Sequence, residues 1–498
     1  MTDRENRQER VLSLVRRVLI LVCFLYILLY LFVAIGRIGY PFELEWMEGA
    51  SVIHVKRILE GKPLYVRPGV EFVPFFYSPL YFYVSSLFSL ILGLGFFPLR
   101  LLSLLSSLGC LLLLFQIVKS ETGSKTMGLV SAGFFAACYS LSGYWYDIGR
   151  VDSLFLLFIL SSLYLVRFQP SRRGWILAGL SMALSFLTKQ SALFIFFFLA
   201  LYTLIVNYRL CLFFILPALV GIGGSTVLLD LIHDGWYVTY LFKIPSRHYL
   251  VKRMFVEFWT GDLAGHIAIA LCISIYGLIL LGKKRSWKHL LFYCLAGVGM
   301  TGASWMSRLH VGGWLNVLMP CHAMIAVWFG VGMHFALESA GERRMTWPKI
   351  AGMALLSLGI CQFALVSWNP LDQIPSRRDR KAGWDLVSMM KGIEGEIFMP
   401  YHSYLPEMAG KKSYIHAHAI FDITRADAGE ITVDFTRRIR DAIQGQRFQA
   451  VILDTPRIMG DFDQYYTKER DIFGEKEVFW PVTGMKTRPE FLFVPKNP

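Results

Sequence analysis

The stretch VLILVCFLYILLYLFVAI, residues 18–35, runs without a single charged side chain. As a helix it would be about 27 Å long, close to the hydrocarbon thickness of a bilayer. The preceding residues, MTDRENRQERVLSLVRR, are basic, and no small-residue cleavage site follows the run. This pattern predicts a membrane-anchoring first helix rather than a cleaved signal peptide.

Similar apolar runs recur along the chain, which has 498 residues, of which 55% are hydrophobic and 17% charged. The composition is typical of a polytopic membrane protein and argues against a large soluble domain. We therefore predict an α-helical membrane protein with about eleven spans. The expected spans are 17–36, 99–119, 126–145, 152–167, 174–189, 190–208, 210–231, 263–282, 289–307, 313–336 and 349–368.

The distribution of Lys and Arg predicts the orientation of these spans. The cations gather in alternate connections, at 1–17, 119–125, 167–173, 209, 283–288 and 343–349. The short opposite connections carry only Arg150, Lys189 and Arg308. The bias holds only if the apolar segment 77–95 does not cross, so we expect a re-entrant or juxtamembrane segment there and a cytoplasmic N-terminus in an inner (plasma) membrane.

This orientation predicts a membrane domain at 1–368 with two large outer loops, at about 37–98 and 232–262. The remainder, 369–498, has mixed charged sequence and is expected to form a small extracytoplasmic, periplasmic α/β domain. EIFMPY (396–401) and QAVILDTP (449–456) are strand-like, and FTRRIRDAIQG (435–445) has the periodicity of an amphipathic helix.

The first outer loop contains PFELEWMEGA, residues 41–50, with the carboxylates Glu43, Glu45 and Glu48. The following stretch, 46–61, predicts an amphipathic helix that lies along the membrane interface. Such acids also decorate solvated loops and helix N-termini. Alternatively, Glu45 and Glu48 help to hold a divalent metal such as Mg²⁺ or Mn²⁺.

Further polar side chains are expected on the same outer face. Their short segments are DIGRVD, FLTKQSA, IPSRHYLVKR and SRLHVGGWLN, and the candidate residues are Arg150, Asp152, Lys189, Gln190, Arg247, His248 and Arg308. Cations there can bind the phosphate of a lipid, and a carboxylate can deprotonate a hydroxyl group. Each also has an ordinary interpretation, as an ion pair, a snorkelling side chain or a headgroup contact.

The order of these motifs resembles the GT-C glycosyltransferases, in particular the branch of protein mannosyltransferases and aminoarabinose transferases (glycosyltransferase family 39-like). The resemblance extends over about 18–330. It rests on the acidic first loop, YSPLY (77–81), the Arg150-x-Asp152 motif, TKQSA (188–192) and GGWLNVLMP (312–320). One departure is Met47, which stands where the branch often has an aspartate before the glutamate.

The resemblance implies transfer of a sugar, with inversion, from a polyprenyl-phosphate donor to an acceptor hydroxyl on the outer membrane face. Glu45 or Glu48 would be the catalytic base, and Asp152 would position the acceptor or a metal. The other expected substrate contacts are Glu43, Tyr81, Arg150, Lys189, Gln190, Arg247, His248 and Arg308. The acceptor stays open between a lipid, a glycan and a protein.

Two other function classes fit the same sequence. A transporter or lipid flippase is the main alternative, although such proteins often show internal repeats and mid-span charges, and this sequence shows neither. A scaffold that displays the C-terminal domain outside is the other. Membrane lipid is an expected partner in every case, and the net charge of +14 is explained by orientation rather than by nucleic-acid binding.

Overall fold

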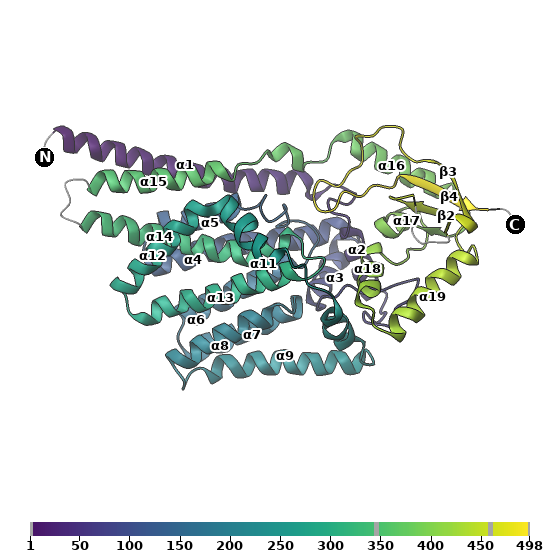
Figure 1. The fold of residues 1–498 in the computed structure, drawn as a ribbon, viewed down its shortest axis with the longest axis horizontal. Helices are drawn as coiled ribbons and strands as arrows, with labels where there is room; N and C mark the ends of the chain where they lie inside the picture. Colours follow the sequence, from purple (N-terminus) through teal and green to yellow (C-terminus); the bar gives the residue numbers. More distant parts are fainter. Residues whose placement is uncertain (1–2, 343–347, 457–461, 497–498) are drawn as a thin grey trace.

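The computed structural model describes residues 3–342, 348–456 and 462–496. A bundle of long helices occupies one end of the molecule and a small mixed domain the other (Figure 1). The N-terminus lies at the far end of the bundle from the C-terminal domain (Figure 1). The predicted fold class, a helical membrane protein with a small C-terminal α/β domain, is confirmed.

Within the described ranges, each of the eleven predicted spans overlaps a helix of the bundle. These helices are α1 (Asp3–Ile38), α4 (Phe96–Thr122), α5 (Lys125–Ala137), α6 (Asp152–Phe168), α7 (Arg172–Thr188), α8 (Ala192–Val206), α9 (Leu212–Ile232), α12 (Gly265–Lys284), α13 (Trp287–Leu309), α14 (Met319–Glu342) and α15 (Pro348–Leu365). Of the described helices, six are long and apolar enough to cross a membrane, or seven if one bent pair is counted as a single span. The chain is thus a multi-pass membrane protein.

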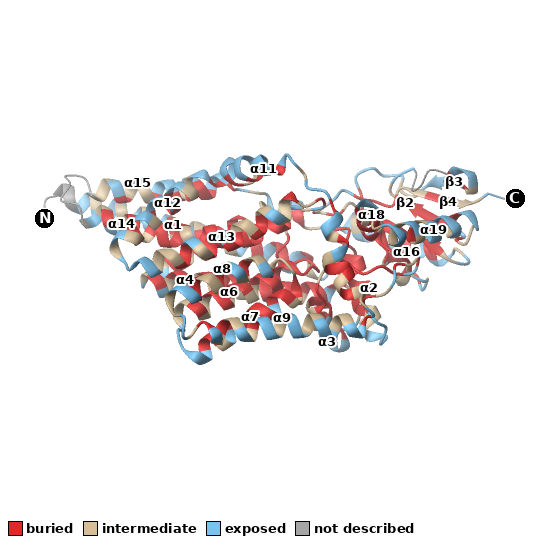
Figure 2. Ribbon diagram, turned by 60° about the horizontal axis from the view of Figure 1, so that its bottom comes forward, coloured by how far each residue is buried: buried red, intermediate tan, exposed pale blue. Residues whose placement is uncertain are grey.

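The surface of the bundle is apolar where a soluble protein would be polar. Leu21 of α1 and Leu231 of α9 are 66% and 74% exposed, and exposed residues line the outer faces of the helices (Figure 2). Exposed leucines at this density are favourable only in contact with lipid.

Two predicted spans have wrong boundaries. The span at 126–145 ends early, because α5 stops at Ala137 and the chain then turns through left-handed conformations at Gly143 (φ +66°) and Tyr144 (φ +58°). The resulting loop, 138–151, is largely buried and carries Arg150. The span at 263–282 begins earlier, because α11 (Met254–Glu257) and a π-helix (Phe258–Ala264) continue into α12.

The first outer loop contains α2 (Glu48–Leu59) and α3 (Leu80–Leu92). The expected helix at 46–61 therefore exists, but its surface placement is wrong: residues 48–55 of α2 are all buried. Residues of the C-terminal domain cover it, since Lys56 pairs with Glu407 at 2.5 Å. Helix α3 has 13 residues, about 20 Å, which is too short to cross a bilayer.

Ion pairs join the basic segments between spans that were predicted to share one side of the membrane. Glu121 at the end of α4 binds Arg167 of α6 at 2.8 Å and His289 of α13 at 2.8 Å. Lys349 of α15 binds Glu9 of α1 at 2.9 Å. These contacts bring the connections together at one end of the bundle. The cations at 343–347 lie outside the described residues.

The C-terminal domain contains a four-stranded sheet in the order β1-β2-β4-β3. β1 (Ile397–Phe398) pairs parallel with β2 (Ala450–Leu453), whereas β4 (Phe491–Pro495) runs antiparallel to both β2 and β3 (Tyr466–Asp471). Helices α16 (Arg377–Lys391), α18 (Ala417–Ala426) and α19 (Glu430–Gln444) pack around it (Figure 1). β1, β2 and α19 coincide with the three predicted segments.

Candidate active site

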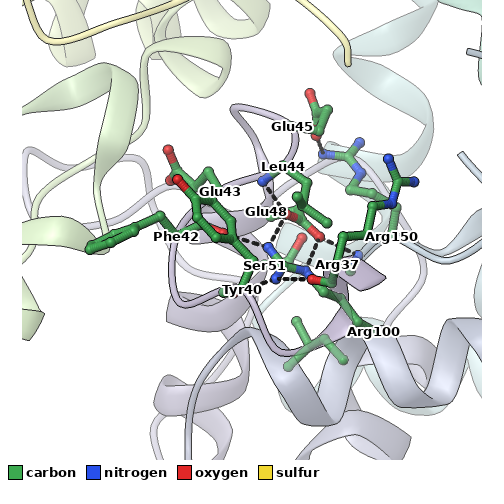
Figure 3. Close-up of polar contacts among 12 residues, drawn as sticks. Arg37, Tyr40, Phe42, Glu43, Leu44, Glu45, Glu48, Ser51, Arg100 and Arg150 are labelled. Atoms are coloured by element: carbon green, nitrogen blue, oxygen red, sulfur yellow. Dashed lines mark hydrogen bonds and ion pairs between the residues drawn. The ribbon is translucent and has the colours of Figure 1, made fainter. Parts of the chain in front are cut away.

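Glu48 is the centre of a buried network between the first outer loop and the bundle (Figure 3). Arg100 of α4 holds both carboxylate oxygens, with Nε 3.0 Å from Oε1 and Nη2 2.7 Å from Oε2. The backbone N–H groups of Gly149 and Leu44 donate to the same oxygens at 2.6 Å and 2.8 Å. Burial acts to raise the pKa of Glu48, but these donors outweigh it and lower the pKa. Glu48 is therefore a fully bonded anion.

Arg100 also fixes the backbone of the acidic loop. Its Nη1 donates to the carbonyl of Tyr40 at 2.5 Å, and its Nη2 donates to the carbonyl of Phe42 at 2.6 Å. A single charge at the start of an apolar span is costly unless it has partners. The sequence shows such a charge at Arg100, but its partner, Glu48, lies 52 positions away and could not be identified from the sequence.

Glu45 is equally buried but has far fewer partners. Its Oε2 accepts a hydrogen bond from the Met47 N–H at 3.2 Å and lies 3.6 Å from Nη1 of Arg150. Its Oε1 has no hydrogen-bond partner in the described parts of the chain. Burial raises the pKa of Glu45 to about 8, against the lowering effect of Arg150, and the nearby Glu48 and Glu43 raise it further. Glu45 is thus a carboxyl group with a free oxygen that can exchange a proton near neutral pH.

Arg150 connects Glu45 to an aromatic wall. Its guanidinium lies over the rings of Phe75 and Tyr77, 5.4 Å and 5.6 Å from their centroids. Nη2 donates to the Tyr77 hydroxyl at 3.2 Å, whereas Nη1 is buried and makes no hydrogen bond with any described residue. An arginine with an unused donor in such a position is suited to binding an anion.

Asp152 and Lys189 form the second ion pair of the site. The Lys189 Nζ lies 2.7 Å from Oδ1 of Asp152, and the Asn316 amide donates to the same oxygen at 3.0 Å. Asp152 is the first residue of α6, and Lys189 ends α7. The Asp152 side chain is buried, and the Lys189 side chain forms part of the wall of a cavity.

This cavity has a volume of about 610 Å³ and lies between the N-terminal end of α8, the C-terminal end of α13, the segment 241–248 and α18. Its polar lining includes Tyr77, Lys189, Gln190, His248, Ser307, His310, His418 and Asp422. Its apolar lining includes Leu193, Phe194, Phe197 and Met306, of which Phe197 and Met306 are 61% and 52% exposed. The cavity therefore opens from a polar head toward an apolar, exposed edge.

The histidines at the polar end link the membrane domain to the C-terminal domain. His248 donates to or accepts from His310 across 3.2 Å, and its Nε2 lies 2.7 Å from the carbonyl oxygen of Asp422. His418 lies 3.1 Å from the Asp422 carboxylate. Burial lowers the pKa of His248, so that its ring is neutral at physiological pH.

Glu43 belongs to a different cluster from its two neighbours in sequence. His402 of the C-terminal domain bridges Glu43, through Nδ1, and Asp454, through Nε2 at 3.1 Å. Burial alone would lower the pKa of His402, but Asp454 and Glu43 raise it to about 10. The cluster is a buried charged connection between the two domains. Neither His402 nor Asp454 was predicted from the sequence. The only signal was the position of Asp454 near the end of a predicted strand.

Three predicted site residues lie away from this cavity. Arg247 is exposed and donates to the carbonyl of Asp427 at 3.1 Å. Arg308 pairs with Asp262 at 2.8 Å. The Tyr81 hydroxyl is buried against α4, where it donates to the Leu99 carbonyl at 2.9 Å. Each of these residues thus has a partner within the fold, and its expected contact with substrate stays a prediction.

The suggested metal site at Glu45 and Glu48 does not fit the geometry. Both oxygens of Glu48 are already occupied by Arg100 and backbone donors. Among the residues that the structure describes, no group of three or more His, Cys, Asp or Glu side chains is arranged to hold a metal ion.

Comparison with known proteins agrees with the fold. Residues 74–229 match the family of dolichyl-phosphate-mannose-protein mannosyltransferases. The structure of ArnT from Cupriavidus metallidurans in the apo state is similar, with a TM-score of 0.58 and 12% identity over 95% of this chain and 97% of ArnT. The same enzyme bound to undecaprenyl phosphate gives a TM-score of 0.55 and 14% identity over 86% and 92%.

A more distant likeness is to the archaeal oligosaccharyltransferase AglB from Archaeoglobus fulgidus in complex with an inhibitory peptide and a dolichol-phosphate. It has a TM-score of 0.50 and 10% identity over 91% of this chain and 70% of AglB. A comparison with curated protein sequences found no match.

These comparisons agree with the predicted resemblance to the GT-C glycosyltransferases: residues 74–229 are similar to the dolichyl-phosphate-mannose-protein mannosyltransferases, and nearly the whole chain has a fold similar to that of ArnT.

Proposed function

We propose that the protein transfers a sugar from a polyprenyl-phosphate donor to an acceptor hydroxyl, and that the cavity beside Lys189 holds the donor. The observation that carries this proposal is the shape of that cavity, which joins a cationic head to an exposed apolar edge. A polyprenyl phosphate has the complementary chemistry, an anionic head on a long hydrocarbon chain.

Lys189 is the principal phosphate ligand in this proposal. Asp152 binds its ammonium group and is itself held by the Asn316 amide, so that the lysine side chain is fixed in one position at the cavity wall. The Gln190 amide and the imidazole rings of His248, His310 and His418 supply further hydrogen-bonding groups at the cavity wall. Asp152 is accordingly a positioning residue for Lys189, and the prenyl chain leaves the cavity between Phe197 and Met306 into the bilayer.

Glu45 is the proposed base, and Glu48 is a structural anion. The distinction rests on hydrogen bonding: Glu48 has four donors, whereas Oε1 of Glu45 has none among the described residues. The Tyr77 hydroxyl faces the cavity and binds Arg150, which faces Glu45. Arg150 therefore lies between the proposed base and the proposed phosphate site.

In the proposed step, the acceptor oxygen attacks the anomeric carbon of the sugar and forms the new glycosidic bond. The bond from that carbon to the phosphate oxygen breaks, and polyprenyl phosphate leaves with the electron pair. Glu45 takes the hydroxyl proton. Lys189 and Arg150 offset the negative charge that develops on the phosphate. A single displacement of this kind inverts the anomeric configuration.

We place this reaction on the outer face of the cytoplasmic membrane. The basic connections at the far end of the bundle favour a cytoplasmic location for that end, and the C-terminal domain lies at the opposite end (Figure 1). The acceptor is a hydroxyl-bearing lipid, glycan or protein that approaches from the outer side.

The reconstituted protein tests the proposal most directly. Purified full-length chain in nanodiscs is mixed with a panel of polyprenyl-phosphate sugars and membrane extract as acceptor, and the release of polyprenyl phosphate is followed. Release with one donor, lost in Glu45→Gln, supports the proposal. Lipid flipping or uptake without release from any donor would favour the transporter alternative.

A further inference from the structure

The loop 475–488, which connects β3 to β4, reaches from the C-terminal domain into the site. Arg488 fastens its two ends together. Its Nη1 donates to the carbonyls of Glu475 and Lys476, both at 2.9 Å, and its guanidinium pairs with the Glu490 carboxylate at 2.7 Å. Because Arg488 is itself buried, the loop has a fixed base rather than a free hinge.

The tip of this loop is bonded to two other loops of the site, the acidic loop and the loop 138–151. The Thr483 N–H donates to the carbonyl of Leu44 at 3.1 Å, and its hydroxyl donates to the carbonyl of Gly143. Phe479 packs against Phe42, with ring centroids 5.2 Å apart. The tip therefore connects the acidic loop to the loop that carries Arg150.

Gly484, the next residue, lies directly against Glu45. A Cβ atom at Gly484 would be 2.7 Å from Cγ of Glu45 and 3.2 Å from its Oε1. The backbone at Gly484 has φ +76°, a conformation that L-residues other than glycine rarely adopt. Two independent requirements, close approach and a left-handed backbone, thus meet at the residue that packs against the side chain of the proposed base.

We propose that the loop 475–488 is a positioning element for the reaction, in which Gly484 holds the Glu45 carboxylate against Arg150 and excludes water from it. This inference rests on the assignment of Glu45 as the base. It makes the C-terminal domain part of the catalytic apparatus, because without the loop the carboxyl group would be hydrated and free to change rotamer.

The substitution Gly484→Ala tests the contact, and Gly410→Ala is its matched control. Gly410 lies in the same domain with nearly the same backbone angle, φ +75°, but a Cβ there meets no atom within 4 Å. Both substitutions place an alanine at nearly the same positive φ, and only the one at Gly484 reaches Glu45. Full-length variants in nanodiscs are compared for thermal stability, kcat, donor KM and the pH dependence of transfer.

We expect Gly484→Ala to lower kcat by about 10- to 100-fold, as small misplacements of a catalytic group do, with donor KM unchanged. The rising limb of its pH profile should move to lower pH, because the hydrated carboxyl group is more acidic. Gly410→Ala should keep the wild-type kcat and profile. Equal kcat values and pH profiles in the two variants would overturn the proposal.

Thr483→Val provides a second variant in case Gly484→Ala does not fold. It keeps the size of the side chain and removes only the hydrogen bond to Gly143, so we expect a smaller shift of the pH profile in the same direction. A wild-type profile in Thr483→Val would count against the loop. Glu45→Gln is measured alongside: if it is inactive while Gly484→Ala is normal, only the loop inference fails, whereas full activity of Glu45→Gln overturns both proposals.

Discussion

The Nη1 atom of Arg150 lies 3.6 Å from Oε2 of Glu45, and within the described ranges it makes no hydrogen bond at all. On its other side the same guanidinium binds the Tyr77 hydroxyl at the wall of the cavity. An arginine in this position can respond to charge on either side. In the reaction proposed above, loss of the sugar leaves a more negative phosphate in the cavity while proton uptake neutralises Glu45, so that Arg150 loses one anionic partner as the other forms.

The first prediction separates the two buried glutamates. Glu45→Gln should lower the rate of transfer by about 10²–10⁴-fold, the usual contribution of a general base, with little change in thermal stability. Glu48→Gln should instead destabilise the protein by about 3–5 kcal/mol, because it leaves the buried Arg100 charge without its anion. Turnover per folded molecule and thermal unfolding of the two variants check this. Equal loss of stability in both would contradict it.

The second prediction concerns pH. A base must be deprotonated to accept a proton, and burial raises the pKa of Glu45 to about 8. We therefore expect kcat/KM to rise with pH and to reach half of its maximum near pH 8, rather than near pH 4.5. The measurement is donor turnover between pH 5.5 and 9.5 in one nanodisc preparation. A rate that is flat above pH 6 would exclude Glu45 in its buried state as the base.

The third prediction concerns the donor phosphate. Lys189→Met removes the cation at the head of the cavity and should raise the donor KM by about 10- to 100-fold, equivalent to about 1.4–2.8 kcal/mol. Lys252→Met is the control, since Lys252 is an exposed lysine on the second outer loop and does not line the cavity. Binding of polyprenyl phosphate to both variants is measured. Identical affinities would place the phosphate elsewhere.

The fourth prediction concerns the His402 cluster. The pKa of His402 is raised from 6.5 to about 10 in the folded protein, so its stabilising charge is present in full below pH 6.5 and is lost as pH rises through 10. The temperature of the thermal unfolding midpoint should therefore decrease as the pH is raised from 7 to 10. In His402→Gln it should start lower and change less over this range. A wild-type midpoint independent of pH would contradict the assignment.

Local sequence predicted the helices well, because an apolar run of about twenty residues in a bilayer must satisfy its own backbone hydrogen bonds, and a helix does so. It also predicted that Asp152 and Lys189 would share a face, which the structure brings to 2.7 Å. It could not distinguish Glu45 from Glu48, since the difference lies in Arg100 and Gly149, which meet Glu48 only after the helices pack. For Arg247 and Arg308, the sequence could not show that each has a partner within the fold, the Asp427 carbonyl and Asp262 respectively.

The loop 475–488 also bears on how such proteins change over evolution. With its tip bonded to Leu44 and Gly143, and with His402 placed between Glu43 and Asp454, the C-terminal domain is not an interchangeable module. A substitution in either part alters the surface that the other must match. The two parts are therefore expected to diverge together, and a chimaera that joins this bundle to the C-terminal domain of a relative should fold poorly unless Glu43 and the loops around Leu44 and Gly143 are exchanged with it.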